Sequence, residues 1–270
     1  MERDYAERRG DVLRELDGLR VEVDSERKIG TLILERPPLN IVSYRGRAQI
    51  RAIIEAFDED DEVGVVVIRG ANGVFSSGGD VKRFPEIPKN KMSDLADNIG
   101  APERCSKPVI AAIEKYALGV GFELSLACDF RFATEDSVVG LPEVTIGQMP
   151  GSGGSARMVR LIGMTRAKDI VMLGKRLPAR EAMEVGIITQ VATDADGLQE
   201  LIHDYAKKLN ALAPISLRAL KRVLNAAPDS SLKVALEVEG HSYEKLRWTE
   251  DYMEGINAFS ERRKGEYKGR

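Results

Sequence analysis

A six-residue run, Val63-Gly64-Val65-Val66-Val67-Ile68, limits the folds open to this chain more than any other feature. A strand that is apolar at nearly every position has no solvent face, so both of its faces must be covered. Similar runs typical of strands occur at 29–34, 109–113 and 130–133, and the apolar residues of 48–57 recur at helical spacing. Strands that alternate with helices predict an α/β fold with a covered sheet.

The strand pattern stops near residue 195, and the remainder of the chain is helical in pattern. Breaks at Pro214, Pro228 and Trp248-Thr249 separate four predicted helices, at 197–210, 214–226, 231–247 and 250–264. At the other end, apolar residues at helical spacing predict a helix over 3–17. We therefore expect three regions: an N-terminal helical extension (1–19), a core (20–194) and a C-terminal helical region (195–270).

Charge and composition argue against several classes of protein. The net charge of −3 gives no electrostatic footprint for nucleic acid. No apolar stretch approaches the roughly 20 residues of a membrane span, and the charged start, Met1-Glu2-Arg3-Asp4-Tyr5, is not a signal peptide. Cys105 and Cys128 are too few for a disulfide framework, so we expect two buried thiols in a reducing compartment. These features predict a cytoplasmic protein with no nucleic-acid or membrane partner.

Two glycine-rich loops have spacings that resemble nucleotide-binding motifs. In the first, Gly73 and Gly78 are followed by Gly79-Asp80 where a phosphate-binding loop needs Lys and Ser or Thr. It is either a plain turn or a turn whose N–H groups face a cleft. The second loop, 151–156, matches G-x-G-x-x-A but follows Met149-Pro150 instead of a buried strand. We therefore expect neither a phosphate-binding loop nor a dinucleotide fold.

A third loop, Gly119-Val120-Gly121, opens a predicted helix that carries Glu123. A helix N-terminus presents unpaired N–H groups and the positive end of the helix dipole, so it can stabilise an oxyanion. One N–H from this loop and one from the Gly79 loop would make a two-donor oxyanion hole. The sequence leaves open whether the two loops meet.

Glu123 and Glu143 are the candidate catalytic groups. A glutamate is ordinarily a salt-bridged or capping residue, but Glu123 has apolar neighbours, and a buried carboxylate is expensive unless it is paired or used. His203 and His241 both fall in charged helices, which disfavours nucleophile–histidine catalysis, and metal-ligand spacings are absent. Carboxylate acid–base chemistry remains, because two environments can separate two pKa values.

Three motifs resemble the enoyl-CoA hydratase/isomerase (crotonase) superfamily, over roughly residues 20–268. They are Phe75-Ser76-Ser77-Gly78-Gly79-Asp80-Val81-Lys82; Lys107-Pro108-Val109-Ile110-Ala111-Ala112 with Ala117 to Leu124; and Leu141-Pro142-Glu143 with Ile146 to Gly154. The resemblance implies a spiral core of ββα turns with C-terminal helices that build trimers or hexamers. It also implies an acyl-CoA thioester substrate, with coenzyme A as part of the substrate instead of a separate cofactor.

The resemblance also implies roles for individual residues. Glu123 and Glu143 match both glutamates of 2-enoyl-CoA hydratases, and the N–H groups of Gly79 and Val120 match the oxyanion hole. Many members have glycine at this position. Val120 keeps the backbone N–H that the oxyanion hole needs, but it adds a side chain that would narrow the pocket. Gly151 matches a glycine that helps hold the attacking water. The residues implied to bind coenzyme A are Ser77, Gly79, Asp80, Val81, Lys82, Tyr243 and Phe259.

Hydration of a 2-enoyl-CoA to a 3-hydroxyacyl-CoA is the expected reaction, and several alternatives stay open. The first alternative is another enzyme on the same scaffold: a Δ3,Δ2-enoyl-CoA isomerase, another acyl-CoA hydratase or a hydrolase. Isomerases of the superfamily often keep only the later glutamate, so the presence of both glutamates favours hydration. A non-catalytic binding protein, including an RNA-binding one, is disfavoured by mild acidity and by the presence of both glutamates. A glycosidase that uses paired carboxylates is disfavoured, because this chain lacks the aromatic platforms that such sites usually have. The assignment of acid and base between Glu123 and Glu143 is also open.

Overall fold

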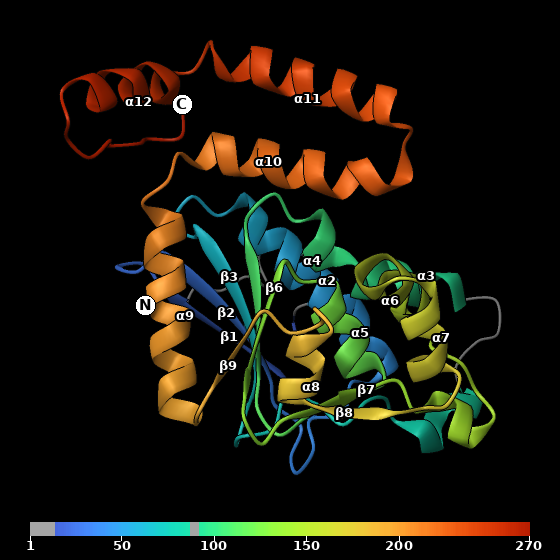
Figure 1. Ribbon diagram of the computed structural model, residues 1–270. Helices are drawn as coiled ribbons and strands as arrows, with labels where there is room; N and C mark the ends of the chain where they lie inside the picture. The colour runs from blue at the N-terminus through green and yellow to red at the C-terminus, as the bar shows by residue number, and fades with distance from the viewer. Residues whose placement is uncertain (1–13, 87–91) are drawn as a thin grey trace.

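Six strands form the main sheet of the protein, in the order β1-β2-β3-β4-β6-β9 (Figure 1). The computed structural model describes residues 14–86 and 92–270. The β1–β2 pair is antiparallel and all other neighbours are parallel. The strands are β1 (Leu19–Asp24), β2 (Ile29–Leu34), β3 (Val65–Gly70), β4 (Val109–Ile113), β6 (Phe130–Thr134) and β9 (Gln190–Ala192).

Helices cover both faces of this sheet because its central strands are apolar on both faces. In β3, Val65 and Val67 join the apolar cluster formed with α9 (Ala195–Asn210). Val66 and Ile68 alternate with them and join the larger core on the opposite face, which includes α2 (Tyr44–Glu59). The prediction of an α/β fold with a covered sheet is confirmed.

A smaller sheet and several helices lie beside the main sheet, on the side of α2. Its three strands are ordered β5-β7-β8, with β5–β7 parallel and β7–β8 antiparallel. Its strands are β5 (Tyr116–Leu118), β7 (Val138–Gly140) and β8 (Arg176–Pro178). The helices of this layer are η2 (Val81–Glu86), α3 (Met92–Ile99), α4 (Ala101–Arg104), α5 (Val120–Leu126), η4 (Glu143–Ile146), α6 (Gly154–Ile162), α7 (Met164–Val171) and α8 (Ala179–Glu184).

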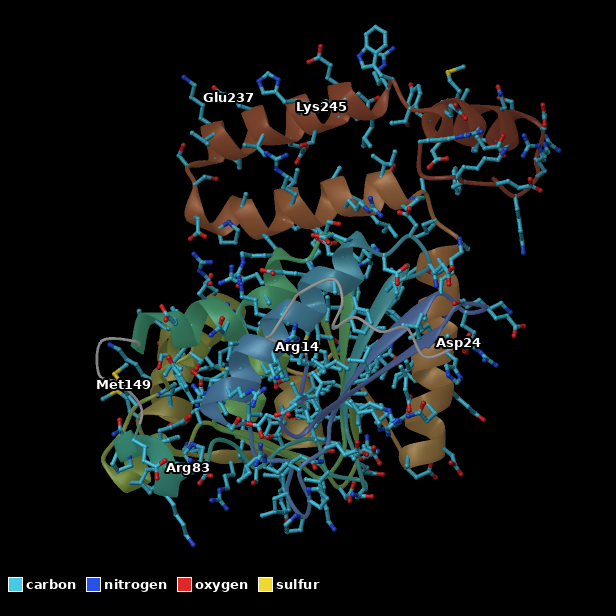
Figure 2. All side chains as sticks on the ribbon, turned by 180° about the vertical axis from the view of Figure 1, so that it is seen from behind. Arg14, Asp24, Arg83, Met149, Glu237 and Lys245 are labelled. Atoms are coloured by element: carbon cyan, nitrogen blue, oxygen red, sulfur yellow. The ribbon has the colours of Figure 1, made fainter. Side chains whose placement is uncertain are left out.

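The C-terminal helices extend beyond one end of the sheet (Figure 1). They are α10 (Pro214–Ala226), η5 (Ala227–Asp229), α11 (Leu232–Leu246) and α12 (Glu250–Ser260). Figure 2 shows Glu237 and Lys245 of α11 pointing away from the core. The same helical region also exposes large apolar side chains, with Leu232 76% and Phe259 87% exposed. Among the described residues, no helix has the length and apolar character that crossing a membrane requires.

The structure confirms the long predicted elements and adds short ones. The strands at 29–34 and 109–113 have the predicted bounds, whereas the strand predicted at 63–68 is observed at 65–70 because Val63 N–H bonds back to the Asp60 carbonyl in a turn. The four C-terminal helices are present. The predicted helix over 3–17 lies mostly outside the described residues, and residues 14–17 are not helical.

Both cysteines are free and buried, as predicted. Burial raises the pKa of Cys105 and of Cys128 to about 12. Thiolates are the reactive form of cysteine, so neither side chain is poised for nucleophilic chemistry at neutral pH.

Candidate active site

A cavity of about 340 Å³ contains both predicted catalytic glutamates. It lies where the Gly78–Gly79 turn, the start of α5 and the segment 142–152 meet. Its wall combines apolar side chains with a few polar groups, as ligand sites usually do. The lining residues are Arg47, Ser77, Gly78, Gly79, Val81, Phe84, Leu95, Gly119, Val120, Glu123, Pro142, Glu143, Thr145, Ile146, Gln148, Met149, Gly151, Ser152 and Arg176.

The two glycine turns that the sequence could not place relative to each other are neighbours in the structure. Leu118 N–H donates to the Ser76 carbonyl at 3.0 Å, which holds the two chain segments side by side. A Cβ on Gly78 would lie 3.2 Å from the Leu118 carbonyl oxygen and 3.9 Å from the Gly119 Cα. Val120 is the first residue of α5, so its N–H has no acceptor within the helix. The backbone therefore brings Gly79 and Val120 to one wall of the cavity.

Glu123 is a buried carboxylate held by backbone donors. The residue is 2% exposed, and its Oε1 accepts N–H bonds from Ser152 at 2.7 Å and from Gly154 at 2.9 Å. Both donors belong to the turn that begins α6, where N–H groups have no helical partner. The loop that resembles a dinucleotide motif thus binds an anion of this chain itself.

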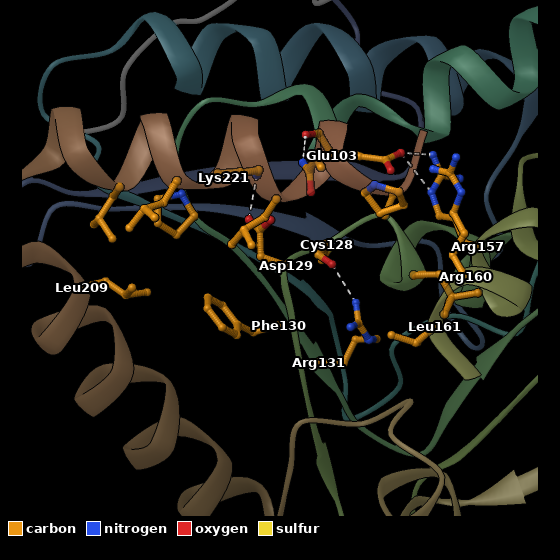
Figure 3. Close-up of a pocket in the computed structure, with 18 residues that line it drawn as sticks. Glu103, Cys128, Asp129, Phe130, Arg131, Arg157, Arg160, Leu161, Leu209 and Lys221 are labelled. Carbon is orange, nitrogen blue, oxygen red and sulfur yellow. Dashed lines mark hydrogen bonds and ion pairs between the residues drawn. The ribbon is translucent and has the colours of Figure 1, made fainter. Parts of the chain in front are cut away.

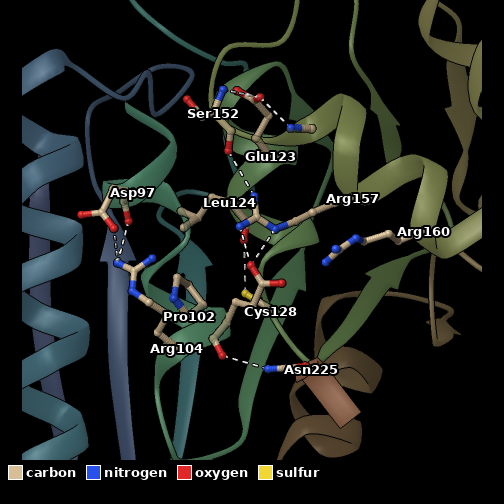
Figure 4. A network of polar contacts seen from close by, with 12 residues as sticks. Asp97, Pro102, Arg104, Glu123, Leu124, Cys128, Ser152, Arg157, Arg160 and Asn225 are labelled. Carbon is tan, nitrogen blue, oxygen red and sulfur yellow. Dashed lines mark hydrogen bonds and ion pairs between the residues drawn. The ribbon is translucent and has the colours of Figure 1, made fainter. Parts of the chain in front are cut away.

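The turn 151–154 is fixed from its other side by Arg157, as Figure 4 shows. Arg157 Nη1 donates to the Ser152 carbonyl at 3.1 Å, and its Nη2 pairs with Glu103 at 2.5 Å. The carboxylate of Glu123 is therefore held on a support that is itself bonded to α4 and α6. Sequence reasoning did not identify Ser152 or Gly154 as donors to Glu123, because a contact across 29 residues depends on the fold.

Gly154→Ala is expected to reduce the rate of the hydration expected from the sequence by about 10- to 100-fold, because small displacements of catalytic groups have effects of this size. A Cβ at position 154 would lie 2.9 Å from Glu123 Cγ and 3.0 Å from Leu141 Cδ1, so the carboxylate would have to move. Gly240→Ala in α11 is the matched control, since nothing lies within 4 Å of the added atom. Steady-state rates and thermal unfolding of both variants test this, and unchanged turnover in Gly154→Ala would contradict it.

Glu143 lies at the start of η4, across the cavity from this support. Its Oε1 is 3.3 Å from the point where a Cβ on Gly119 would lie, and its Oε2 is buried without a hydrogen-bond partner among the described residues. Burial raises the pKa of Glu143 to about 7; a hydrogen bond from its own backbone N–H opposes this rise, nearby Glu123 adds to it, and Arg47 lowers it slightly. The two carboxylates consequently have different surroundings, one with two N–H donors on Oε1 and one without a partner on Oε2.

Arg47 is a cavity residue that sequence reasoning missed. It is 5% exposed and donates from Nη1 to Ser152 Oγ at 3.1 Å. Burial lowers the pKa of Arg47, and the charges of Glu123 and Glu143 oppose this shift. A signal was present in the sequence, since Arg47 precedes Ile50 by three residues and Ile54 by seven, which places it on the buried face of the helix.

Some of the remaining predicted site residues line this cavity, and others do not. Ser77, Val81 and Gly151 line the cavity, whereas Asp80 lines an adjoining cavity of about 430 Å³ and Lys82 is exposed. Tyr243 and Phe259 do not line the cavity of their own chain; they are exposed on α11 and α12. Their predicted role at coenzyme A therefore requires a second copy of the chain, and it stays a prediction.

Histidine and metal chemistry receive no support at this cavity. His203 lies on α9 and His241 on α11, both exposed and neither in the cavity wall. Within the described ranges, no group of three or more His, Cys, Asp or Glu side chains is arranged to hold a metal ion. The groups in the cavity wall that could act on a ligand include the two carboxylates, Arg47 and backbone N–H donors.

A further cavity, of about 450 Å³, lies between α10 and β6 (Figure 3). Its charged side chains are satisfied within the chain: Lys221 pairs with Asp129 at 2.7 Å, and Arg157 pairs with Glu103. Arg131 donates to the Cys128 carbonyl at 2.6 Å. The Lys221–Asp129 pair connects α10 to the core and the other two bonds lie within the core, so the polar groups of this cavity have a structural role.

Comparison with known proteins identifies the family of the chain. The family model described as enoyl-CoA hydratase/isomerase matches residues 24–270. The chain belongs to this family, the crotonase family. A Rhizobium meliloti relative described as "Probable enoyl-CoA hydratase" is 34% identical over 254 residues, which cover 92% of this chain and 97% of the relative. A Dictyostelium discoideum relative, "Probable enoyl-CoA hydratase, mitochondrial", is 33% identical over 87% of this chain and 86% of its own length.

Solved structures of the crotonase family share the fold described above. The crystal structure of an enoyl-CoA hydratase from Bacillus anthracis superposes with a TM-score of 0.88 at 33% identity, covering 94% of this chain and 100% of the other. Two mixed sheets followed by C-terminal helices are therefore the crotonase architecture in this chain, as the motifs predicted.

Proposed function

We propose that this chain hydrates a 2-enoyl-CoA thioester to the 3-hydroxyacyl-CoA. The observation that carries the proposal is the pair of unlike carboxylates in one cavity. Glu123 accepts two N–H bonds on one oxygen, an arrangement that suits an ionised, acceptor-only carboxylate. Glu143, whose pKa burial raises to about 7, exists partly as the protonated acid at neutral pH. One group is thus suited to accept a proton from water and the other to donate a proton to carbon.

The proposed reaction follows from these positions. The N–H groups of Gly79 and Val120 bind the thioester oxygen, so that addition at C3 produces a stabilised enolate. Glu123 accepts a proton as water adds its oxygen to C3, and the N–H of Gly151 helps hold that water. Glu143 then transfers its proton to C2, and the two carboxylates exchange the proton through solvent before the next turnover. Orientation of the water by two fixed groups lowers the barrier by several kcal/mol.

Loss of the 2-enoyl thioester absorbance of crotonyl-CoA, with a product heavier by one water, tests this reaction directly. A double-bond isomerase would change the position of the double bond of a 3-enoyl-CoA without a change of mass. A hydrolase would release free coenzyme A. Butyryl-CoA binding by calorimetry, with no change in crotonyl-CoA, would contradict hydration of a simple enoyl group while leaving the thioester site in place.

The pH dependence of hydration is a second expectation. Because Glu143 acts in its protonated form and its pKa is raised to about 7, kcat/KM should reach its maximum value below this pH. It should fall about tenfold per pH unit as the pH rises beyond it. Rates from about pH 6 to about pH 9 measure the profile. A constant kcat/KM across this range would remove Glu143 from the role of acid.

We also propose that the C-terminal region, 195–270, associates with further copies of the chain, as a trimer or a hexamer. The support is the exposed apolar surface of this region, including Leu232, Leu236, Trp248 and Phe259. Such an assembly is what would bring Tyr243 and Phe259 to a neighbouring coenzyme A. Molar mass from light scattering tests it. The cytoplasmic location stays a prediction, since one relative is described as mitochondrial.

A further inference from the structure

Arg47 is a buried cation that the proposed hydration chemistry does not use. It lies in the first turn of α2, 5% exposed, and lines both the candidate active site and the adjoining cavity. Taking a charge out of water costs several kcal/mol unless partners replace the lost hydration. The identity of those partners therefore matters.

The chain supplies only part of what the guanidinium needs. Of its five N–H donors, the described residues satisfy one, through the 3.1 Å bond from Nη1 to Ser152 Oγ. Nε is buried without an acceptor, and the guanidinium forms no ion pair with any described carboxylate. Buried arginines ordinarily meet carboxylates or several carbonyl oxygens, as Arg131 does with three backbone carbonyls. Arg47 has a deficit of acceptors by this standard.

The deficit is located beside the place where the acyl group would react. Nη2 lies 3.2 Å from the point where a Cβ on Gly79 would be, and Nη1 contacts Ser152, whose N–H holds Glu123. The guanidinium therefore lies between Gly79, the proposed oxyanion donor, and Ser152, whose N–H donates to the proposed base. The reacting carbons and the next atoms of the acyl chain would occupy this region.

We propose that Arg47 binds a free carboxylate on the acyl chain, so that the substrate class is a short 2-enoyl-CoA with a second, terminal carboxyl group. The inference rests on the proposed function for the location of the acyl group. A planar guanidinium matches a carboxylate with two parallel N–H bonds, and a ligand carboxylate supplies the hydrogen-bond acceptors that the chain omits. A phosphate of coenzyme A could accept the same charge-assisted bonds, and the paired ligands and variants described below distinguish it from an acyl carboxylate.

Support of the loop at Ser152 does not account for Arg47. Ser152 is already bonded through its carbonyl to Arg157 and through its N–H to Glu123 (Figure 4). A neutral donor could make the one bond to Ser152 Oγ without burying a charge. A supporting role also makes a different prediction, because it would influence every acyl-CoA alike.

Calorimetric titration with saturated thioesters in matched pairs tests the proposal, since these cannot be hydrated. The pairs are succinyl- and butyryl-CoA, glutaryl- and valeryl-CoA, and adipyl- and hexanoyl-CoA. The unaltered protein should bind the carboxylated member at least about tenfold more tightly in one or more pairs, the scale of a charge-assisted bond. No preference at any chain length would overturn the proposal without any variant being made.

Two variants separate recognition from support. Arg47→Met should abolish the preference within each pair, whereas Ser152→Ala should preserve it, because the guanidinium keeps its charge. An equal weakening of both members by Arg47→Met, with the ratio unchanged, would indicate loop support or a phosphate contact and would contradict the proposal. Hydration of crotonyl-CoA without any preference would refute this inference alone. A preference that depends on Arg47, without hydration of the matching enoyl-CoA, would refute the proposed function alone.

Discussion

Glu143→Gln should lower the hydration rate of crotonyl-CoA by at least about 100-fold, the usual contribution of a general acid. The amide has the same shape but has no proton to give to C2. Its Oε2 position is buried and unpartnered, so little else in the described structure depends on this oxygen. The rate is measured by loss of enoyl absorbance, with butyryl-CoA affinity as the check that the cavity still forms. Retention of full activity would exclude Glu143 as the acid.

The same variant should stabilise the fold, by an amount that increases with pH. In the folded chain the pKa of Glu143 is raised from the ordinary 4.5 to about 7. Between these values the folded state keeps a proton that the unfolded state releases, so the parent protein loses stability as the pH rises through this window. The glutamine variant has no such loss. Urea unfolding should therefore favour Glu143→Gln over the parent at pH 8 and show a smaller difference at pH 5.

Glu123→Gln should also reduce hydration by at least about 100-fold, for a different reason. A glutamine oxygen can still accept the N–H bonds from Ser152 and Gly154, so the turn at the start of α6 should be preserved. The negative charge that attracts the proton of the attacking water is removed. Single-turnover rates with crotonyl-CoA measure this effect separately from product release.

Glu114→Gln is a matched control for both substitutions. Glu114 is also partly buried, and burial raises its pKa, but it lies outside the cavity wall. Neutralising it should leave hydration within about twofold, as for a change remote from the site. If Glu123→Gln were as active as Glu114→Gln, the water would have to be activated by another group.

The sequence predicted the central strands well because each is long enough to show its own apolar pattern. The strands at 116–118, 138–140, 176–178 and 190–192 are three residues each, too short to give a period. The pairing of these short strands depends on neighbours distant in the chain, which a local pattern cannot contain. The strand at 19–24 was also missed, although its alternation of apolar and charged residues is a local pattern that predicts a strand.

Several residues that line the candidate site could be predicted individually, but their arrangement could not. The apolar neighbours of Glu123 indicated a buried and partnered carboxylate, and the structure supplies those partners in Ser152 and Gly154. The meeting of the Gly79 and Val120 turns depends on the pairing of 76 with 117, which no motif states. Arg47 was visible only as a charge on an otherwise apolar helical face.

The bond between the turn 151–154 and Glu123 has a consequence for redesigning this enzyme. This turn forms part of the cavity wall and also holds a carboxylate, so mutations that enlarge the wall there would alter two properties at once. Val81, Phe84 and Leu95 also line the cavity but have no such connection to Glu123. Libraries that seek new acyl groups should therefore diversify these three positions and leave the turn intact.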